Sequence, residues 1–252
     1  GHGYFYMRKR RGQIIDGVVL IDKPVDCSSN HVLQRVKRLI DAQKAGHTGT
    51  LDPFATGLLI CCLGKATKIA TRMLDADKQY VATLKLGQET DSGDLTGVIV
   101  ADLGADYVAP DRDAIETALK QFIGTIEQVP PMTSALKHKG KPMYHYARQG
   151  IEIDRPPRQV VIHDLSLLDY DGVTATISVD CSKGTYVRTL AQDIGRALGI
   201  YAHLIALKRT RIGPFLLDDA WSVSSLEDMD DVRRVVLATN TLPEPYRLEV
   251  TS

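Results

Sequence analysis

The residues best suited to chemistry lie at positions 46–57, where the sequence reads GHTGTLDPFATG. This segment holds one imidazole, His47, one carboxylate, Asp52, and three glycines. Pro53 restricts Asp52 toward extended backbone, so the carboxylate is placed rather than free to move. Glycines favour unusual dihedral angles or close approach to a partner. A catalytic loop is one interpretation; the alternative is an ordinary turn in which Asp52 bonds its own backbone.

A second candidate is Arg188, in the run CSKGTYVR at positions 181–188. The pattern predicts a strand that ends near Ser182, a glycine turn, and a helix with Arg188 in its first turn. A cation gains nothing from the helix dipole there, so an anionic partner would explain its position. A guanidinium keeps a neighbouring carboxylate ionised at neutral pH. The alternative is an exposed surface arginine.

Tyr80 is the third candidate, at the start of a predicted strand. An aromatic ring there could stack on a nucleobase, a contact worth about 1–3 kcal/mol. A core tyrosine is the equally ordinary alternative.

Other chemistries fit poorly. Gly57 and the run Gly64–Thr67 resemble a phosphate-binding loop, but the spacing of the glycines is too long and Ala66 replaces the hydroxyl residue that holds magnesium. No G-x-S-x-G nucleophile motif is present. The four cysteines form no C-x-x-C pair, which predicts free thiols rather than zinc or disulfides. Adjacent Cys61 and Cys62 should point to opposite faces of a strand.

Hydrophobic periodicity predicts the elements that must position these candidates. Strands are expected at 18–22, 58–63, 80–86, 159–168, 173–179 and 203–212. Helices are expected at 30–40, 65–74, 111–123 and 184–198. Positions 46–57 and 88–97 are expected to be loops, and residues 171–172 the turn of a hairpin. This order favours an α+β fold with a large mixed, mainly antiparallel sheet flanked by helices.

The formal net charge of the 252 residues is zero, yet the charges are segregated. Residues 1–68 carry 11 Lys and Arg against 5 Asp and Glu, and residues 131–213 carry 12 against 7. If these two basic blocks meet, they form a face for a polyanion; solvated surfaces are the alternative. Residues 130–158 mix basic residues and tyrosines between prolines, a pattern that suits a mobile arm that grips nucleic acid; an ordinary surface insertion is the alternative. The longest apolar run, 58–63, is too short to cross a bilayer.

Several motifs together resemble the bacterial TruB-type tRNA pseudouridine synthases. They occur in the family order and cover roughly residues 16–213. The motifs are Asp22-Lys23-Pro24 with Ser28-Ser29, then positions 46–53, Lys78-Gln79-Tyr80, and the runs 86–91, 131–137 and 183–188. The run at 147–151 resembles the thumb insertion of the bacterial tRNA enzymes. In one departure, Asp26 and Cys27 stand where the family usually has a glycine and a small or apolar residue.

The resemblance implies the pseudouridine synthase fold and the conversion of tRNA uridine 55, in the T-loop, to pseudouridine without cofactor or metal. Asp52 matches the catalytic aspartate, as nucleophile or as base for the 2′ proton. Arg188 matches its arginine partner, and Tyr80 the tyrosine that stacks on the target base. His47 matches a histidine that holds the extruded nucleotide, and Lys23 a supporting lysine. Further RNA contacts are expected at Gly49, Thr50, Leu51, Lys137, Arg148, Lys183 and Tyr186.

We therefore expect a catalytic domain at 7–213 with its thumb at 130–158, followed by an acidic segment at 214–252 that is too short for a complete PUA-type domain. Residues 1–6, ahead of Met7, are expected to be a cloning remnant. The protein is expected to be cytoplasmic and monomeric, and to bind the tRNA T-stem-loop without any membrane. The rival hypothesis is a non-catalytic RNA-binding or RNA-folding module, which would not need Asp52, Tyr80 and Arg188 together.

Overall fold

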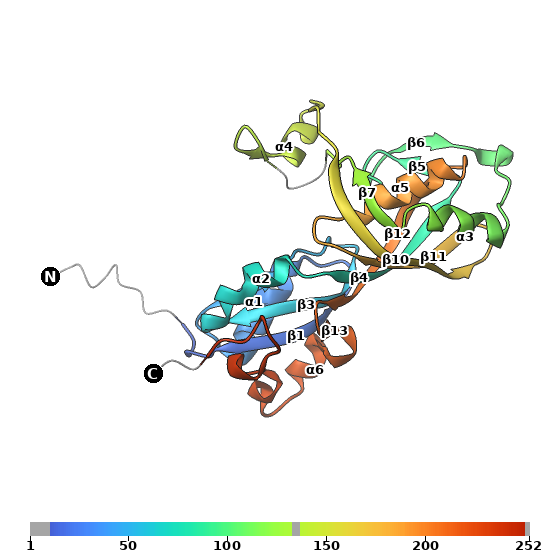
Figure 1. The fold of residues 1–252 in the computed structure, drawn as a ribbon. Helices are drawn as coiled ribbons and strands as arrows, with labels where there is room; N and C mark the ends of the chain where they lie inside the picture. Colours follow the sequence, from blue (N-terminus) through green and yellow to red (C-terminus); the bar gives the residue numbers. More distant parts are fainter. Residues whose placement is uncertain (1–10, 133–136, 250–252) are drawn as a thin grey trace. The chain divides into compact units, whose positions relative to one another are not determined.

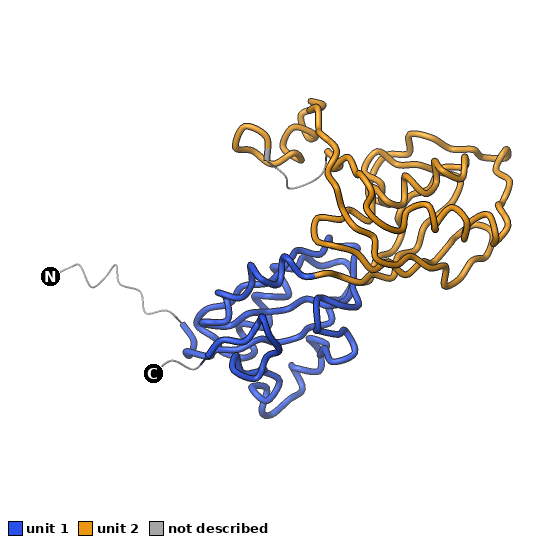
Figure 2. The backbone as a smooth tube through the Cα atoms, in the orientation of Figure 1, with its two compact units in different colours: residues 1–76, 209–252 blue, residues 77–208 orange. Residues whose placement is uncertain are grey.

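The chain forms two compact units (Figure 2). The computed structural model describes residues 11–132 and 137–249. Unit 1 comprises residues 1–76 and 209–252, and unit 2 comprises residues 77–208. One strand, β12 (Ala202–Ile212), belongs to unit 2 by its first seven residues and to unit 1 by its last four.

Unit 1 is a sheet with helices on both faces (Figure 1). Its strands are β1 (Gly17–Lys23), β2 (Ala45–Thr48), β3 (Thr56–Leu63), β13 (Phe215–Leu216) and β14 (Trp221–Ser222). Its helices are α1 (Ser29–Ile40), α2 (Ala70–Leu74) and α6 (Val223–Glu227), with short 3₁₀ turns at Gly64–Ile69, Leu217–Asp219, Val232–Val235 and Thr239–Thr241. Strand β3 pairs antiparallel with β1 and with β2, and β14 adds to β1 in parallel.

The core of unit 1 explains the long apolar run of β3. Successive residues of β1 and β3 point to opposite faces, and both faces are covered, so both strands are apolar throughout. Cys61 packs on the face covered by α1 and α6, whereas Cys62 packs on the face that holds Met73 and Tyr246. The prediction for the two cysteines is therefore confirmed, and both are buried free thiols.

Gly57, at the start of β3, is required by the backbone of β12. Its φ is +108°, and a Cβ there would overlap the backbone N and O of Arg209. We expect Gly57→Ala to lose about 1–3 kcal/mol of unfolding free energy through backbone strain and about 1–3 kcal/mol more through the overlap. Gly172 is the matched control, since its φ is +92° but a Cβ would meet nothing within 4 Å. Equal losses in urea unfolding of the two variants would contradict the role of the overlap.

Unit 2 is built around a long antiparallel hairpin. Its strands are β4 (Lys78–Leu86), β5 (Gln88–Thr90), β6 (Ile99–Asp102), β7 (Gly124–Gln128), β8 (Lys137–His138), β9 (Lys141–Pro142), β10 (Arg158–Tyr170) and β11 (Thr174–Cys181). Its helices are α3 (Arg112–Lys120), α4 (Met143–Arg148) and α5 (Val187–Ala197), with a 3₁₀ turn at Gly104–Asp106. The strands β4, β11, β10 and β7 follow one another in the sheet, each antiparallel to the next.

The expected α+β class and mainly antiparallel sheet are confirmed, and so is the hairpin that turns at residues 171–172. Three expectations were wrong in detail. Residues 45–48 form the short strand β2 rather than part of a loop, and residues 88–90 form β5. The segment expected as one helix at 65–74 is a 3₁₀ turn followed by a single α-helical turn. Within the described residues, no helix is long and apolar enough to cross a membrane.

Candidate active site

Asp52 lies in unit 1, in the segment that joins β2 to β3. Its side chain is half-buried, and its carbonyl accepts a hydrogen bond from the Ala55 N–H at 2.9 Å. This bond closes a turn through Pro53, as the sequence predicts. The flanking residues Leu51 and Pro53 are each held by a buried side chain from elsewhere in unit 1.

Ser29 holds Leu51. The Ser29 hydroxyl accepts a hydrogen bond from the Leu51 N–H at 2.9 Å and donates one to the Leu51 carbonyl at 3.0 Å. Both residues are buried. The N-cap of α1 is Ser28, whose Oγ accepts from the His31 N–H. The two adjacent serines therefore have different roles: Ser28 caps the helix, and Ser29 fixes the backbone of Leu51, the residue before Asp52.

Lys23 holds Pro53 from the other side. Its side chain is fully buried, and Nζ donates to the carbonyls of Pro24 at 2.8 Å, Cys27 at 2.7 Å and Pro53 at 3.3 Å. Burial lowers the pKa of Lys23, while the nearby charges of Cys27, Asp26 and Asp52 oppose that shift. Lys23 thus ties the Pro24–Cys27 turn to the turn that follows Asp52.

Asp26 completes this junction. Its N–H donates to the Pro53 carbonyl at 2.8 Å, and its φ of +64° is in the left-handed region that favours glycine. The departure noted in the sequence therefore falls on a residue in a glycine-like conformation.

Arg209 contacts both ends of the segment that runs from Gly49 to Leu58 and contains Asp52. The sequence analysis did not predict this residue. It is 2% exposed; its Nε donates to the Leu58 carbonyl at 2.9 Å and its Nη2 to the Gly49 carbonyl at 3.1 Å. Gly49 has a φ of +72°. One buried guanidinium thus joins the beginning and the end of the segment that carries Asp52.

His47 and Thr48, at the end of β2, each have a buried polar side-chain atom without a hydrogen-bond partner among the described residues. Burial, and then the charge of Arg209, lowers the pKa of His47, which favours the neutral imidazole at pH 7. Among the described residues, no protein group hydrogen-bonds His47 Nδ1 or Thr48 Oγ1, although both atoms are buried. Thr50 is exposed. A neutral imidazole can donate through one ring nitrogen and accept through the other.

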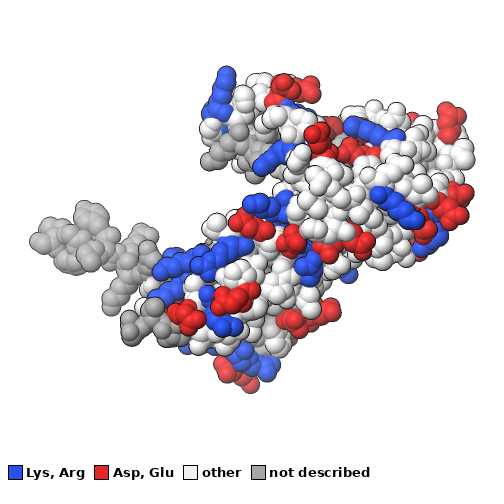
Figure 3. All heavy atoms as spheres, viewed as in Figure 1, with Lys and Arg blue, Asp and Glu red and all other residues white. Residues whose placement is uncertain are grey.

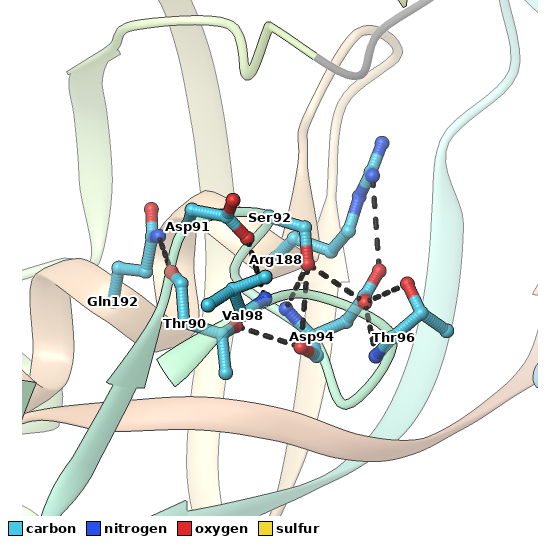
Figure 4. A network of polar contacts seen from close by, with 8 residues as sticks. All are labelled: Thr90, Asp91, Ser92, Asp94, Thr96, Val98, Arg188 and Gln192. Carbon is cyan, nitrogen blue, oxygen red and sulfur yellow. Dashed lines mark hydrogen bonds and ion pairs between the residues drawn. The ribbon is translucent and has the colours of Figure 1, made fainter. Parts of the chain in front are cut away.

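Arg188 lies in unit 2, at the second residue of α5, and it has an anionic partner there (Figure 4). Its Nη1 is 3.7 Å from Asp94 Oδ2, and the two side chains are 15% and 3% exposed. The exposed-arginine alternative is therefore wrong. Asp94 was not predicted as this partner, because residues 88–97 were interpreted only as a polar loop.

Asp94 is itself held rigidly by its own loop. Its Oδ1 accepts hydrogen bonds from Ser92 Oγ at 2.9 Å, from Thr96 Oγ1 at 2.6 Å and from the Thr96 N–H at 2.8 Å. Gly93 has a φ of +82°, and a Cβ there would lie 2.8 Å from the Arg188 carbonyl. The loop thus packs tightly on the start of α5 and presents a buried carboxylate to the guanidinium.

The turn before α5 is also fixed by a buried amide. Gln128 accepts from the Tyr186 N–H at 2.9 Å and donates to the Tyr186 carbonyl at 3.1 Å. Lys183, in the same turn, is exposed. Tyr80 pairs with Val179 in the β4–β11 ladder and shares its side of the strand with buried Ala82 and Leu84. Tyr80 is half-buried at the end of that apolar row. It is therefore not a fully buried core tyrosine, and part of it stays accessible.

The segment at 130–158 carries α4 and lies away from the sheet of unit 2 (Figure 1). The Arg148 guanidinium lies over the Tyr144 ring, 4.8 Å from its centroid, and the Tyr146 hydroxyl donates to the His138 carbonyl at 2.7 Å. Lys137 begins β8, and its side chain lies outside the described part of the chain. Among the described residues, no three His, Cys, Asp or Glu side chains are grouped to hold a metal ion.

The sequence matches two known family models over most of its length. Residues 37–187 match the family described as TruB family pseudouridylate synthase (N terminal domain), and residues 188–242 match the tRNA pseudouridylate synthase B C-terminal domain. The chain belongs to the TruB family. It is therefore an isomerase that converts uridine in tRNA to pseudouridine, and the family resemblance of its motifs is confirmed.

Curated relatives agree over most of the chain. The tRNA pseudouridine synthase B of Bordetella pertussis is 62% identical over 94% of this chain and 97% of its own length. That of Chromobacterium violaceum is 55% identical over 88% of this chain and 72% of its own. Among solved structures, a chain of a Cbf5-Nop10-Gar1 complex is 29% identical with a TM-score of 0.69, covering 89% of this chain and 60% of that one. The TruB fold expected from the sequence is thus confirmed.

The Ser29 contact yields a prediction for this TruB-family enzyme. Ser29→Ala removes a hydrogen-bond partner from the N–H and from the carbonyl of buried Leu51, at a cost of about 1–3 kcal/mol of unfolding free energy. Because Leu51 directly precedes Asp52, we also expect a lower single-turnover rate at saturating enzyme. The control is Ser28→Ala, which loses the N-cap at about 0.5–2 kcal/mol but leaves Leu51 untouched. A rate loss equal in the two variants would show that only stability is affected.

Proposed function

We propose that the substrate uridine is position 55, in the T-loop of tRNA, and that Asp52 is the carboxylate that acts at its ribose. The observation that carries this proposal is the fixation of Asp52 from both sides: Ser29 holds Leu51, and Lys23 holds Pro53. A carboxylate placed so rigidly loses little freedom when it meets a reacting atom. Attack on the anomeric carbon and removal of the 2′ proton both need it ionised.

The remaining roles follow the family resemblance. Arg188 is proposed as the cation that keeps Asp52 ionised. Within unit 2, the Asp94 carboxylate lies 3.7 Å from its guanidinium and helps to hold it in place. Tyr80 stacks on the extruded uracil, and neutral His47 helps to hold the nucleotide outside the helix stack. Removing a base from its stack costs a few kcal/mol, which such contacts repay. Uracil leaves through N1, turns, and rejoins the ribose through C5, so the reaction balances without oxidant or cofactor.

RNA binding is proposed to use the exposed and half-exposed residues of the same segments. Thr50 and Lys183 are exposed, and Gly49, Leu51 and Tyr186 belong to the fixed backbone beside them. Arg148 and Lys137 lie on the arm at 130–158, proposed to close on the loop of the RNA. The enzyme is proposed to act as a monomer, in the compartment where tRNA is processed, the cytoplasm.

The test of the substrate position uses a tRNA transcript and the same transcript with cytidine at position 55. We expect stoichiometric pseudouridine in the first and none in the second, measured by release of tritium from 5-tritiated uridines. Equal release from the two transcripts would show that another uridine is the target.

A further inference from the structure

The arm at 130–158 leaves the sheet of unit 2 and returns to it at one place, its root (Figure 1). Strands β7 and β10 pair antiparallel there, and Gln128, the last residue of β7, lies opposite Arg158, the first residue of β10. Close to the root, the Ile153 N–H donates to Met132 Sδ at 3.4 Å and joins the two limbs of the arm. Gln128 is therefore the residue at which the arm is attached to the sheet.

Gln128 also holds the first turn of α5. Its buried side chain accepts from the Tyr186 N–H at 2.9 Å and donates to the Tyr186 carbonyl at 3.1 Å. The same carbonyl accepts from the Leu190 N–H at 3.1 Å, which is the first hydrogen bond of α5. Tyr186 is the N-cap residue and makes no side-chain cap bond. The Gln128 amide thus orients the peptide that begins the turn carrying Arg188.

A second, longer contact joins the root to this turn. The Thr189 hydroxyl donates to the Val129 carbonyl at 3.5 Å. Further out, a cavity of about 750 Å³ lies between α5 and the arm, with Met132 and Ile151 on the side of the arm and Gln192 on the side of α5. The arm therefore contacts the start of α5 through residues 128 and 129 at its root.

The charge of this cavity does not suit RNA. Figure 3 shows acidic side chains gathered where the arm meets the rest of unit 2. Two cations line the cavity, and one of them, Arg196, is paired with Glu89 at 2.7 Å. The carboxylates that line it are Asp91, Glu127, Glu152 and Asp193. Such a surface repels phosphates, so RNA on the arm would influence Arg188 through the root rather than through the cavity.

We propose that Gln128 is a positioning residue that sets Arg188 relative to the arm, so that RNA held by the arm stabilises the reactive position of the guanidinium. This inference rests on the proposed function for the arm and for Arg188, and it adds the link between them. A buried amide with hydrogen bonds to both groups of one peptide is rigidly oriented. It therefore transmits a displacement of the root to the first turn of α5.

The first experiment removes both hydrogen bonds with Gln128→Met, which keeps the length and volume of the side chain. We expect the single-turnover rate at saturating enzyme to fall by about ten- to a hundredfold, the scale of a misplacement of about 1 Å. Affinity for a tRNA transcript should stay within a few-fold of wild type. A wild-type rate in this variant would overturn the proposal.

The matched control is Tyr107→Phe. It removes another hydrogen bond from a side chain to the backbone of unit 2, from the Tyr107 hydroxyl to the Gly172 carbonyl at 2.7 Å, at the opposite end of β10 from Arg158. We expect a lower urea midpoint in both variants and a wild-type rate in the control. Equal rate losses in the two variants would reduce Gln128 to a stabilising residue and overturn its positioning role.

A second variant, Gln128→Glu, tests the same bonds without deleting the polar group. The new carboxylate accepts from the Tyr186 N–H, but only its protonated form has a donor for the Tyr186 carbonyl. Its rate divided by the wild-type rate at the same pH should therefore rise as the pH is lowered from about 8 to about 6, since burial raises the pKa of a carboxyl group. A wild-type rate at both pH values would contradict the proposal.

A double-variant cycle with Arg148→Gln tests the link between the arm and Arg188. In the wild-type background, loss of this arm cation should weaken tRNA binding and lower the single-turnover rate at saturating enzyme several-fold. In the Gln128→Met background the same change should weaken binding without a further loss of rate, because coupled residues are not additive. Equal rate losses in both backgrounds would overturn the link. Unchanged binding by Arg148→Gln would instead refute the proposed arm contact, so the two failures can be told apart.

Discussion

We expect Asp52→Asn to abolish pseudouridine formation while RNA binding stays within a few-fold of wild type. Asparagine keeps the shape of the side chain and leaves the backbone contacts of Ser29 and Lys23 intact, but it cannot act as a base or a nucleophile. Loss of a general base alone costs about 10²–10⁴ in rate, and loss of a nucleophile stops the covalent route. We therefore expect at least a hundredfold lower single-turnover rate.

The measurement pairs tritium release with equilibrium binding of the same T-stem-loop RNA. The Asp52→Asn variant also tests the rival hypothesis for the function, in which the protein only binds or refolds RNA. Product formation at the wild-type rate by Asp52→Asn would remove Asp52 from the chemistry. Loss of binding together with loss of product would instead assign Asp52 to recognition.

Arg188→Leu is expected to have the second-largest effect. Removal of a charged group that stabilises charge in a reaction costs about 10²–10³ in rate. The same change leaves the Asp94 carboxylate, 3% exposed, without its cation, although Ser92 and Thr96 still donate to it. We expect a loss of about 1–3 kcal/mol in unfolding free energy from this orphaned charge.

The double variant Arg188→Leu/Asp94→Asn separates the two roles. Neutralising Asp94 should restore most of the lost unfolding free energy, because no uncompensated buried charge remains. The rate should stay low if the guanidinium acts on the reacting groups. Recovery of the rate together with stability would mean that Arg188 serves only to balance Asp94.

Local patterns made much of the fold predictable. Strand β3 is covered on both faces and therefore has a continuous apolar run. In β4, buried and half-buried residues alternate, which is typical of a strand. The Asp171–Gly172 turn connects β10 to β11. The strand β2 was missed because its glycine and polar residues have no strand pattern; β3 imposes its conformation by pairing. The helix expected at 65–74 is instead a 3₁₀ turn at Gly64–Ile69 followed by the short helix α2, and the buried positions alone do not distinguish the two kinds of helix.

The residues of the candidate site could be predicted from the sequence only where they belong to a family motif. Lys23, His47, Asp52 and Arg188 follow from the family resemblance, but the side chains that hold them do not. Asp94 and Arg209 act over long sequence separations, and Ser29 differs from Ser28 only by which way its hydroxyl points. Such contacts depend on tertiary packing, which no local pattern records.

The division of unit 1 between the two ends of the chain bears on its synthesis. Strand β1 pairs with β14, and Val18 bridges to Leu237, more than 200 residues later. Ribosomes add roughly 5–20 residues per second, so the first strand waits on the order of ten seconds or more for its last neighbours. Residues 77–208 emerge as one continuous stretch in that interval and can fold first. The nascent chain therefore carries an incomplete apolar sheet during translation, a stage at which binding by chaperones has the most to protect.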